Sequence, residues 1–305
     1  MALSRWVIPF VLAGSAWSGA AAAAAPLVRP NVLAEFPHDA NAFTQGLLHH
    51  GGTLYESTGL RGRSSLRRVE LATGTVLLDI DLGTSEFGEG LARVDDRLIQ
   101  LTWQEHVAHV YDLETFEPVT DFAYDTEGWG LCFDGHQLVM TDGSDQLFFR
   151  DPDSFEVLRS VSVVDDGVPL EDLNELECVH GLVLANVWKT DTIAVIDPKT
   201  GQVLERVDAS GLLSQDEQAS ADVLNGIAHD ASTGHLYLTG KLWPKLFEVE
   251  LELPVTAPAT PRKGGSCAMC AMGQGPNDGL VGWLIVLTSI VWRRVSPAGA
   301  RSRAR

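Results

Sequence analysis

FGEGLARVDDRLIQLTW, the stretch from Phe87 to Trp103, belongs to a pattern that the chain contains five times. Each copy has a polar residue, a small or apolar one and an aliphatic one, then a turn, and then a strand-like run. The other copies are FTQGLLHHGGTLYESTG at residues 43–59, EGWGLCFDGHQLVMTDG at 127–143, LNELECVHGLVLANVW at 173–188 and LNGIAHDASTGHLYLTG at 224–240.

The spacing of the copies indicates what each unit is. Their common positions are about 44, 40, 46 and 50 residues apart, counted between Gly46, Gly90, Gly130, Leu176 and Gly226. This is the period of a β-propeller blade. Apolar residues alternate with a period of two, and turn residues separate four short runs, as in an antiparallel blade. We therefore expect an all-β fold in which residues 26–254 form one five-bladed β-propeller, with only a short turn of helix around residues 210–222.

The fifth copy lacks its fourth strand. Only GIAHD, HLYLTG and LFEVELE follow one another before Pro254. The unassigned segment NVLAEFPH, residues 31–38, has the composition of the missing strand. We predict that this N-terminal strand closes the last blade, because closure protects both edge strands of the ring.

Both ends of the chain differ from the repeats. Residues 1–25 combine Arg5, an apolar stretch and the run SGAAAAA, which is typical of a signal peptide cleaved near Pro26. Residues 255–278 are rich in Pro, Gly and small side chains and predict a flexible linker. Residues 279–305 contain a short hydrophobic segment followed by a basic tail.

The C-terminal region has two interpretations. The stretch GGSCAMC, Gly264–Cys270, together with the apolar segment and the arginines after it, resembles the sorting signals of bacterial surface proteins. The alternative is a retained membrane anchor, although Leu280–Trp292 is shorter than the roughly 20 residues that span a bilayer. Both interpretations predict an exported protein, periplasmic or at the cell surface, that meets the membrane only through this segment.

The charge of the chain restricts its partners. The formal net charge is −19, and setting aside Arg5 and a net +6 from Arg262 onward leaves about −26 on the repeats. Such an acidic balance argues against nucleic acid or an anionic membrane surface as a partner. We expect a soluble monomer outside the cytoplasm.

The chain has four cysteines, which is too few for a disulfide scaffold. Cys267 and Cys270 lie in the sorting-type stretch, whereas Cys132 and Cys178 occupy matching positions in neighbouring repeats. We predict that Cys132 and Cys178 are small buried strand residues. The alternative is a disulfide or a metal pair between them, which no further Cys or His at ligand spacing supports.

The candidate site comes from positions at which the repeats differ. If the first strand of each blade lines the central channel, the side chains around the Gly-Leu pair converge at one mouth of it. Aromatic walls with an acid, amides and a lysine form a pocket for a small polar, cationic ligand. The candidates are Phe43, Gln45, Phe87, Glu89, Trp103, Trp129, Asn174, Trp188 and Lys241. Taken singly, each has a structural alternative, such as packing between blades for the tryptophans or a surface charge for Lys241.

At these residues the chain resembles the glutaminyl cyclases of the plant and bacterial type, which are five-bladed propeller enzymes. The resemblance covers about residues 32–251, without the signal peptide and the tail. One departure is Arg61, where the family often carries Tyr, and we expect it to matter little because it lies on the outer part of a loop. The shared stretches include FTQGL at Phe43, FGEGL at Phe87, EGWGLC at Glu127, LNELE at Leu173, NVWKTD at Asn186 and TGKLWPKLFEVEL at Thr239.

The resemblance implies cyclisation of an N-terminal glutamine to pyroglutamate in peptides and proteins, with release of ammonia. The substrate's own α-amine is the nucleophile. Glu89 would shuttle the proton, with its pKa raised by apolar neighbours. Three catalytic partners would bind the carboxamide or the oxyanion, namely Gln45, Asn174 and Lys241. The aromatic residues would bind the substrate and exclude water, namely Phe43, Phe87, Trp103, Trp129 and Trp188.

This mechanism requires no metal or other cofactor, and the nine histidines contain no His-x-x-x-His pair. A structural calcium ion in the channel is compatible with the acids and backbone carbonyls expected there. Two other functions stay open, since a fold does not fix an activity. They are a calcium-dependent propeller lactonase or other hydrolase, and a non-enzymatic surface propeller that binds peptides or glycans.

Overall fold

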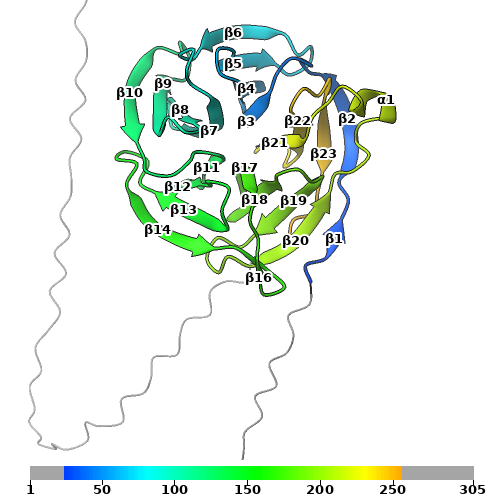
Figure 1. Cartoon of the computed structure of the whole chain (residues 1–305). Coiled ribbons are helices and arrows are strands. Elements are labelled where there is room, and N and C mark those ends of the chain that lie inside the picture. Colours follow the sequence, from blue (N-terminus) through cyan, green and yellow to red (C-terminus); the bar gives the residue numbers. More distant parts are fainter. Residues whose placement is uncertain (1–23, 256–305) are drawn as a thin grey trace, which may run out of the picture. The chain divides into compact units, whose positions relative to one another are not determined.

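The computed structural model describes residues 24–255, and these residues form a ring of five antiparallel sheets (Figure 1). The sheets follow one another around a common centre as the blades of a propeller. The one helix within residues 24–255 is α1, Gln215–Gln218, which begins at a capping box formed by Ser214 and Glu217. The predictions of an all-β, five-bladed β-propeller and of a short helical turn are confirmed.

The first three blades each take four consecutive strands, from the innermost to the outermost. Blade 1 contains β3 (Thr44–His50), β4 (Thr53–Thr58), β5 (Ser65–Glu70) and β6 (Val76–Asp81). Blade 2 contains β7 (Gly88–Val94), β8 (Arg97–Thr102), β9 (Val107–Asp112) and β10 (Pro118–Ala123). Blade 3 contains β11 (Leu131–Phe133), β12 (Leu138–Met140), β13 (Gln146–Arg150) and β14 (Val157–Ser162).

The last two blades each recruit a strand from the N-terminus. Blade 4 contains β17 (Leu173–Val179), β18 (Leu182–Val187), β19 (Thr192–Ile196) and β20 (Val203–Asp208), with β1 (Leu27–Val28) added in parallel to β20. Blade 5 contains β21 (Leu224–His229), β22 (Leu236–Gly240), β23 (Lys245–Glu250) and β2 (Asn31–Pro37). A small hairpin precedes blade 4, formed by β15 (Val164–Asp165) and β16 (Val168–Pro169).

The N-terminal strand β2 closes the ring as predicted. It pairs antiparallel with β23, with Asn31 opposite Glu250 and Phe36 opposite Leu246. The short parallel strand β1 was not foreseen, because two residues carry no periodicity that a sequence could reveal.

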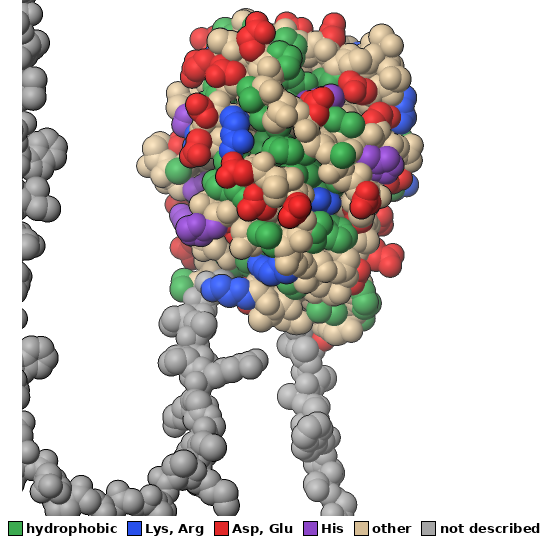
Figure 2. Space-filling model, turned by 90° about the vertical axis from the view of Figure 1, so that its left-hand side faces the viewer, with side chains coloured by type: hydrophobic (Ala, Val, Ile, Leu, Met, Phe, Trp, Pro, Cys, Tyr) green, Lys and Arg blue, Asp and Glu red, His purple; other side chains and the backbone are tan. Residues whose placement is uncertain are grey.

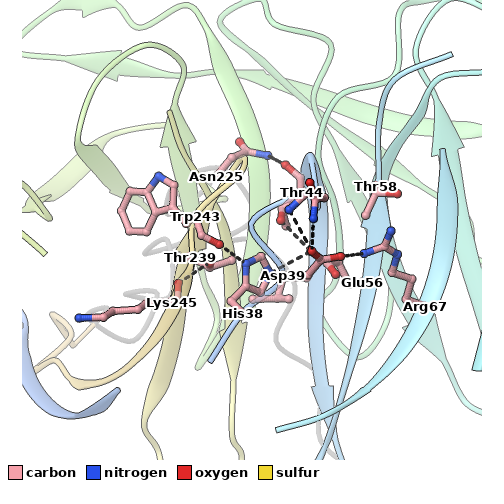
Figure 3. Close-up of polar contacts among 12 residues, drawn as sticks. His38, Asp39, Thr44, Glu56, Thr58, Arg67, Asn225, Thr239, Trp243 and Lys245 are labelled. Carbon is pink, nitrogen blue, oxygen red and sulfur yellow. Dashed lines mark hydrogen bonds and ion pairs between the residues drawn. The ribbon is translucent and has the colours of Figure 1, made fainter. Parts of the chain in front are cut away.

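A buried polar network holds the closed blade 5 against blade 1 (Figure 3). His38 Nδ1 donates to the carbonyl oxygen of Trp243 at 2.7 Å, and its Nε2 lies 3.1 Å from Glu56 Oε1. Thr44 Oγ1 donates to the same carboxylate oxygen at 2.7 Å. Burial acts to lower the pKa of His38 and to raise that of Glu56. The attraction between the two groups and their hydrogen bonds outweigh burial, so the pKa of His38 is raised and that of Glu56 is lowered.

The innermost strands approach one another closely because glycines recur in them. A Cβ on Gly46 would lie 2.5 Å from the amide nitrogen of Leu91, and one on Gly90 would lie 2.5 Å from that of Leu131. Gly130 packs in the same way against the carbonyl oxygen of Asn174. The leucines that follow the glycines are buried between the blades. The glycines at these three positions therefore allow the inner strands of neighbouring blades to approach closely around a narrow axis.

Cys132 of β11 and Cys178 of β17 form a disulfide, so our prediction of two independent buried cysteines was wrong. Their Cα atoms lie 5.5 Å apart, and 46 residues separate them in the sequence. Matching positions in consecutive repeats fall on neighbouring inner strands, which brings the two thiols together. The disulfide joins blade 3 to blade 4.

Figure 2 views the ring from the side, and acidic side chains are spread over this side, where Lys and Arg are fewer. Within residues 24–255 no helix has the length and apolar character needed to cross a membrane. The predicted signal peptide at residues 1–25, the linker at 255–278 and the hydrophobic segment with its basic tail at 279–305 lie almost entirely outside the described residues, as do Cys267 and Cys270.

Candidate active site

A cavity of about 350 Å³ opens among the blades, and all nine side chains singled out from the sequence line it. Three further residues, Lys189, Asp222 and Val223, complete the lining. The predicted members are Phe43, Gln45, Phe87, Glu89, Trp103, Trp129, Asn174, Trp188 and Lys241.

Local irregularities in the innermost strands carry the polar residues of this cavity. The strand register shifts between Thr44 and Gly46 in β3, between Gly88 and Leu91 in β7, and between Leu173 and Leu176 in β17. Such shifts mark β-bulges, which turn a side chain out of the regular alternation. Gln45, Glu89 and Asn174 lie within these three intervals, one per strand, so the repeat delivers three polar side chains from three blades to one place.

Glu89 is the buried acid of the site, with 4% of its surface exposed. Its Oε2 atom is fully buried and has no hydrogen-bond partner among the described residues. Burial raises the pKa of Glu89 well above its usual range, while attraction by Lys241 and hydrogen bonding by Gln45 act against it. Repulsion by Glu127 and Glu105 adds to the increase. The carboxyl group therefore takes up and releases a proton at a higher pH than an exposed Glu does.

Lys241 supplies the cation. It follows β22 and is also 4% exposed, and burial lowers the pKa of its ammonium group, while Glu89 and Asp222 act in the opposite direction. Its Nζ lies 4.9 Å from the centre of the Phe43 ring, a distance at which the ring face attracts a cation.

The two amide side chains of the cavity, Gln45 and Asn174, differ in their hydrogen-bond partners. Asn225, which corresponds to Asn174 in the next blade, donates through Nδ2 to the carbonyl oxygen of Thr44 at 3.0 Å (Figure 3). The same Nδ2 donates to Gln45 Oε1 at 3.3 Å. Because its Oε1 is engaged, the Gln45 side chain can present its NH₂ group to a ligand. Asn174 Oδ1 is buried and has no partner among residues 24–255, so it can accept a hydrogen bond from one.

Aromatic rings form the wall of the cavity. Phe43 meets Phe87 at 6.1 Å between ring centres, and Phe87 meets Trp103 at 5.6 Å, both edge to face. On the other side Trp129 meets Trp188 at 5.4 Å, again edge to face. These contacts fix the rings against one another and exclude water from Glu89.

The sequence did not single out several residues that act on this wall. Lys189 Nζ lies 3.8 Å from the Trp188 ring centre, and its position directly after Trp188 in NVWKTD was the available signal. The Arg61 guanidinium lies 5.4 Å from the Trp103 ring centre and 2.6 Å from Glu105 Oε1. Arg61 is exposed, as expected for an outer loop residue, yet it covers one of the walls.

Within the described part of the chain, no group of three or more His, Cys, Asp or Glu side chains is arranged to hold a metal ion. The polar side chains of its lining are instead two carboxyl groups, two lysines and two amides, namely Glu89, Asp222, Lys189, Lys241, Gln45 and Asn174. Together they can move a proton and hydrogen-bond a carbonyl group.

Comparison with known proteins agrees with this site. The model of the family described as glutamine cyclotransferase matches residues 7–251. The chain is 44% identical over 226 residues to an Arabidopsis thaliana glutaminyl-peptide cyclotransferase, covering 72% of this chain and 71% of the relative. The crystal structure of Myxococcus xanthus glutaminyl cyclase superposes with a TM-score of 0.68 at 39% identity, covering 74% of this chain and 97% of that one. The chain therefore belongs to the glutamine cyclotransferase family.

Proposed function

We propose that this protein is a glutaminyl-peptide cyclotransferase, which converts the N-terminal glutamine of peptides and proteins to pyroglutamate and releases ammonia. The observation that carries the proposal is the buried carboxyl of Glu89 in the lining of an aromatic cavity that Lys241 and two amides also line. Membership of the family and the named activity of its Arabidopsis relative support the same conclusion.

The reaction forms one C–N bond and breaks another. The substrate's α-amine attacks the side-chain carboxamide carbon, the tetrahedral intermediate collapses, and the side-chain nitrogen leaves as ammonia. An α-amino group has a pKa of about 7.7–8.0, so an appreciable neutral fraction exists at neutral pH. The nucleophile needs positioning more than activation.

Glu89 carries the proton in this mechanism. It accepts the proton that the attacking nitrogen loses and donates it to the departing nitrogen, so that neutral ammonia can leave. A general acid and base works best when its pKa lies near the working pH. The burial that raises the pKa of Glu89 therefore serves the chemistry directly.

Lys241 and the two amides act on the carboxamide oxygen. Negative charge develops there in the tetrahedral intermediate, and donors fixed in advance stabilise it most effectively in a site without water. Lys241 and the NH₂ groups of Gln45 and Asn174 are the donors of the cavity. The aromatic wall binds the folded glutamine and attracts its ammonium group.

The decisive experiment measures ammonia released from a dipeptide with N-terminal glutamine, with the same dipeptide acetylated at its α-amine as control. The free peptide should yield ammonia and pyroglutamate, whereas the acetylated one should yield neither. Absence of ammonia from both would refute the proposal.

A chelator extends the assay to calcium. We propose that any calcium ion in the channel is structural, so chelation should leave the turnover unchanged at a temperature well below unfolding and lower only the midpoint of unfolding. Opening of a lactone that stops with chelator would instead identify a calcium-dependent hydrolase. A protein that binds peptides and turns over neither substrate would be a binding propeller.

We also propose that the enzyme is exported and acts as a monomer outside the cytoplasmic membrane. The pattern of residues 1–25 supports export, and so does the Cys132–Cys178 disulfide, because disulfides persist in oxidising compartments. Mass spectrometry of both termini of the mature protein would test cleavage near Pro26 and distinguish a processed sorting signal from a retained anchor.

A further inference from the structure

The aromatic wall of the cavity consists of two sets of rings. Phe43, Phe87 and Trp103 follow one another edge to face on one side, and Trp129 and Trp188 do so on the other. Among the described residues no ring contact joins Trp103 to Trp129. Packing between rings therefore does not fix the distance between the two sets.

Glu127 spans this gap. Its Oε2 atom accepts a hydrogen bond from Trp103 Nε1 at 2.7 Å and another from Trp129 Nε1 at 3.1 Å. Its Oε1 atom accepts from Gln104 Nε2 at 2.9 Å. A single carboxylate oxygen thus binds one tryptophan from each set of rings, through hydrogen bonds of the stronger, charge-assisted kind.

The backbone around Glu127 is held in place as well. The amide of Gly128 donates to the carbonyl oxygen of Trp103 at 2.8 Å, and Thr126 Oγ1 donates to that of Glu127 at 3.0 Å. Gly128 also packs so closely against the carbonyl oxygen of Thr102 that a Cβ would overlap with it. The carboxylate is thereby presented from a fixed segment.

Glu127 also remains charged at neutral pH. Burial acts to raise its pKa, but the hydrogen bonds from Gln104, Trp129 and Trp103 outweigh burial, and the pKa of Glu127 is lowered. The two indoles consequently share a full negative charge.

We propose that Glu127 is a positioning residue that sets the distance between the Trp103 and Trp129 walls, and thereby the fit of the glutamine side chain. This role rests on the proposed function, because the proposed function identifies the N-terminal glutamine residue as the ligand that binds between the walls. A site whose walls are fixed before binding loses less free energy to reorganisation when the ligand enters.

The matched pair of variants is Glu127→Gln and Glu105→Gln. Both carboxylates repel Glu89, so each substitution removes a charge that acts on that residue in the same direction. They differ in contacts, since Glu105 pairs with Arg61 and accepts from the Phe87 amide but bonds neither indole. A weaker Glu127→Gln variant therefore reports on the contacts that only Glu127 makes, with the two indoles and with Gln104.

Steady-state kinetics with a glutamine dipeptide give the first result. Glu127→Gln should raise KM about tenfold, as expected for the loss of charged hydrogen bonds that hold the binding walls, with kcat within about threefold of that of Glu105→Gln. Glu105→Gln should change KM less than about twofold. An equal change of KM in the two variants would overturn the proposal.

The indole N–H signals in an ¹H–¹⁵N spectrum give a second result without any substrate. Trp103→Phe and Trp129→Phe identify the two signals. In Glu127→Gln the N–H signals of Trp103 and Trp129 should both move upfield, because a charged acceptor is lost. In Glu105→Gln the chemical shifts of both signals should remain unchanged. Unmoved signals in Glu127→Gln would show that the carboxylate does not hold the indoles. This measurement is independent of turnover, so failure of the proposed function would be seen separately as absence of ammonia from the wild type.

Discussion

Glu89 and Lys241 are buried side chains of opposite charge, and burial moves the pKa of each away from its ordinary value in the direction of neutral pH. Burial raises the pKa of Glu89 and lowers that of Lys241, and each group partly offsets the effect on the other. An exposed pair would keep its ordinary values and would be of little use for shuttling a proton. In the proposed mechanism, the exclusion of water thus prepares Glu89 to carry the proton.

Glu89→Gln tests the proton transfer. The amide keeps the shape of the side chain but cannot take up a proton, so kcat should fall by about 10²–10⁴-fold. KM should remain within a few-fold, because the walls and amides still bind the substrate. Turnover near that of the wild type would remove Glu89 from the mechanism.

Glu105→Gln tests the electrostatic control of Glu89. The negative charge of Glu105 disfavours the carboxylate form of Glu89, so removing it should lower the pKa of Glu89. If Glu89 must accept a proton, kcat/KM falls as the pH drops through this pKa. The acidic limb of the profile of kcat/KM against pH should therefore move to lower pH in the variant. A limb that does not move, or that moves to higher pH, would contradict the assignment.

The innermost strands have two roles, which are to pack around the axis and to direct polar side chains into the cavity. Their glycines allow five strands to meet around the axis, and their bulges direct Gln45, Glu89 and Asn174 into the cavity. A change that pushes one inner strand outward must therefore affect both stability and the site.

Gly90→Ala measures the closeness of this packing. Its Cβ would meet backbone atoms of Gly130 and Leu131, which cannot rotate away, so the free energy of unfolding should fall by about 1–3 kcal/mol. Gly83→Ala is the control, because its Cβ would meet only the flexible side chain of Glu86. Urea unfolding of both variants checks the prediction, which fails if the two lose equal stability.

At the scale of the molecule, the links between blades include the polar network between blades 5 and 1 and the disulfide between blades 3 and 4. The sheet hydrogen bonds stay within the blades, so contacts between blades depend on packing and on such links. We expect both links to contribute to global stability.

The His38–Glu56 pair should make stability depend on pH. The raised pKa of His38 stabilises the fold below its ordinary value of 6.5, and this contribution is lost as the pH rises through the raised value. The lowered pKa of Glu56 stabilises the fold above 4.5, and this contribution is lost as the pH falls through the lowered value. The loss of unfolding free energy in His38→Gln should thus be largest between about pH 4.5 and 6.5 and decline above that range. A pH-independent loss would exclude ionic pairing.

The double variant Cys132→Ala, Cys178→Ala tests the disulfide. A link across 46 residues restricts the unfolded chain and should be worth about 4 kcal/mol. The wild type treated with a reductant should unfold at the same urea concentration as the variant. Equal stability of the oxidised wild type and the variant would show that the link is not structural.

The sequence could predict the ring and the cavity because both follow from one repeated unit. The steps between copies predict the blades, and the polar residues that flank the common position of the copies predict Gln45, Glu89 and Asn174. Side chains that leave from loops follow no such period, which is why Glu127 was quoted only as part of a motif and the contact of Arg61 with Trp103 was not foreseen. The disulfide between Cys132 and Cys178 was only the alternative to two separate buried cysteines, because the matching positions alone do not show that adjacent inner strands bring the two thiols into contact.

Closure by β2 and β23 also determines when the protein becomes whole during its biosynthesis. Strand β2 is synthesised early but cannot pair until β23, the last strand, has been made, because Asn31 pairs with Glu250. A chain that stops short of Lys245 leaves β2 without its partner and β22 as a bare edge, and exposed edges invite aggregation and proteolysis. Only a chain that has been synthesised through β23 can therefore close the ring and protect its edge strands.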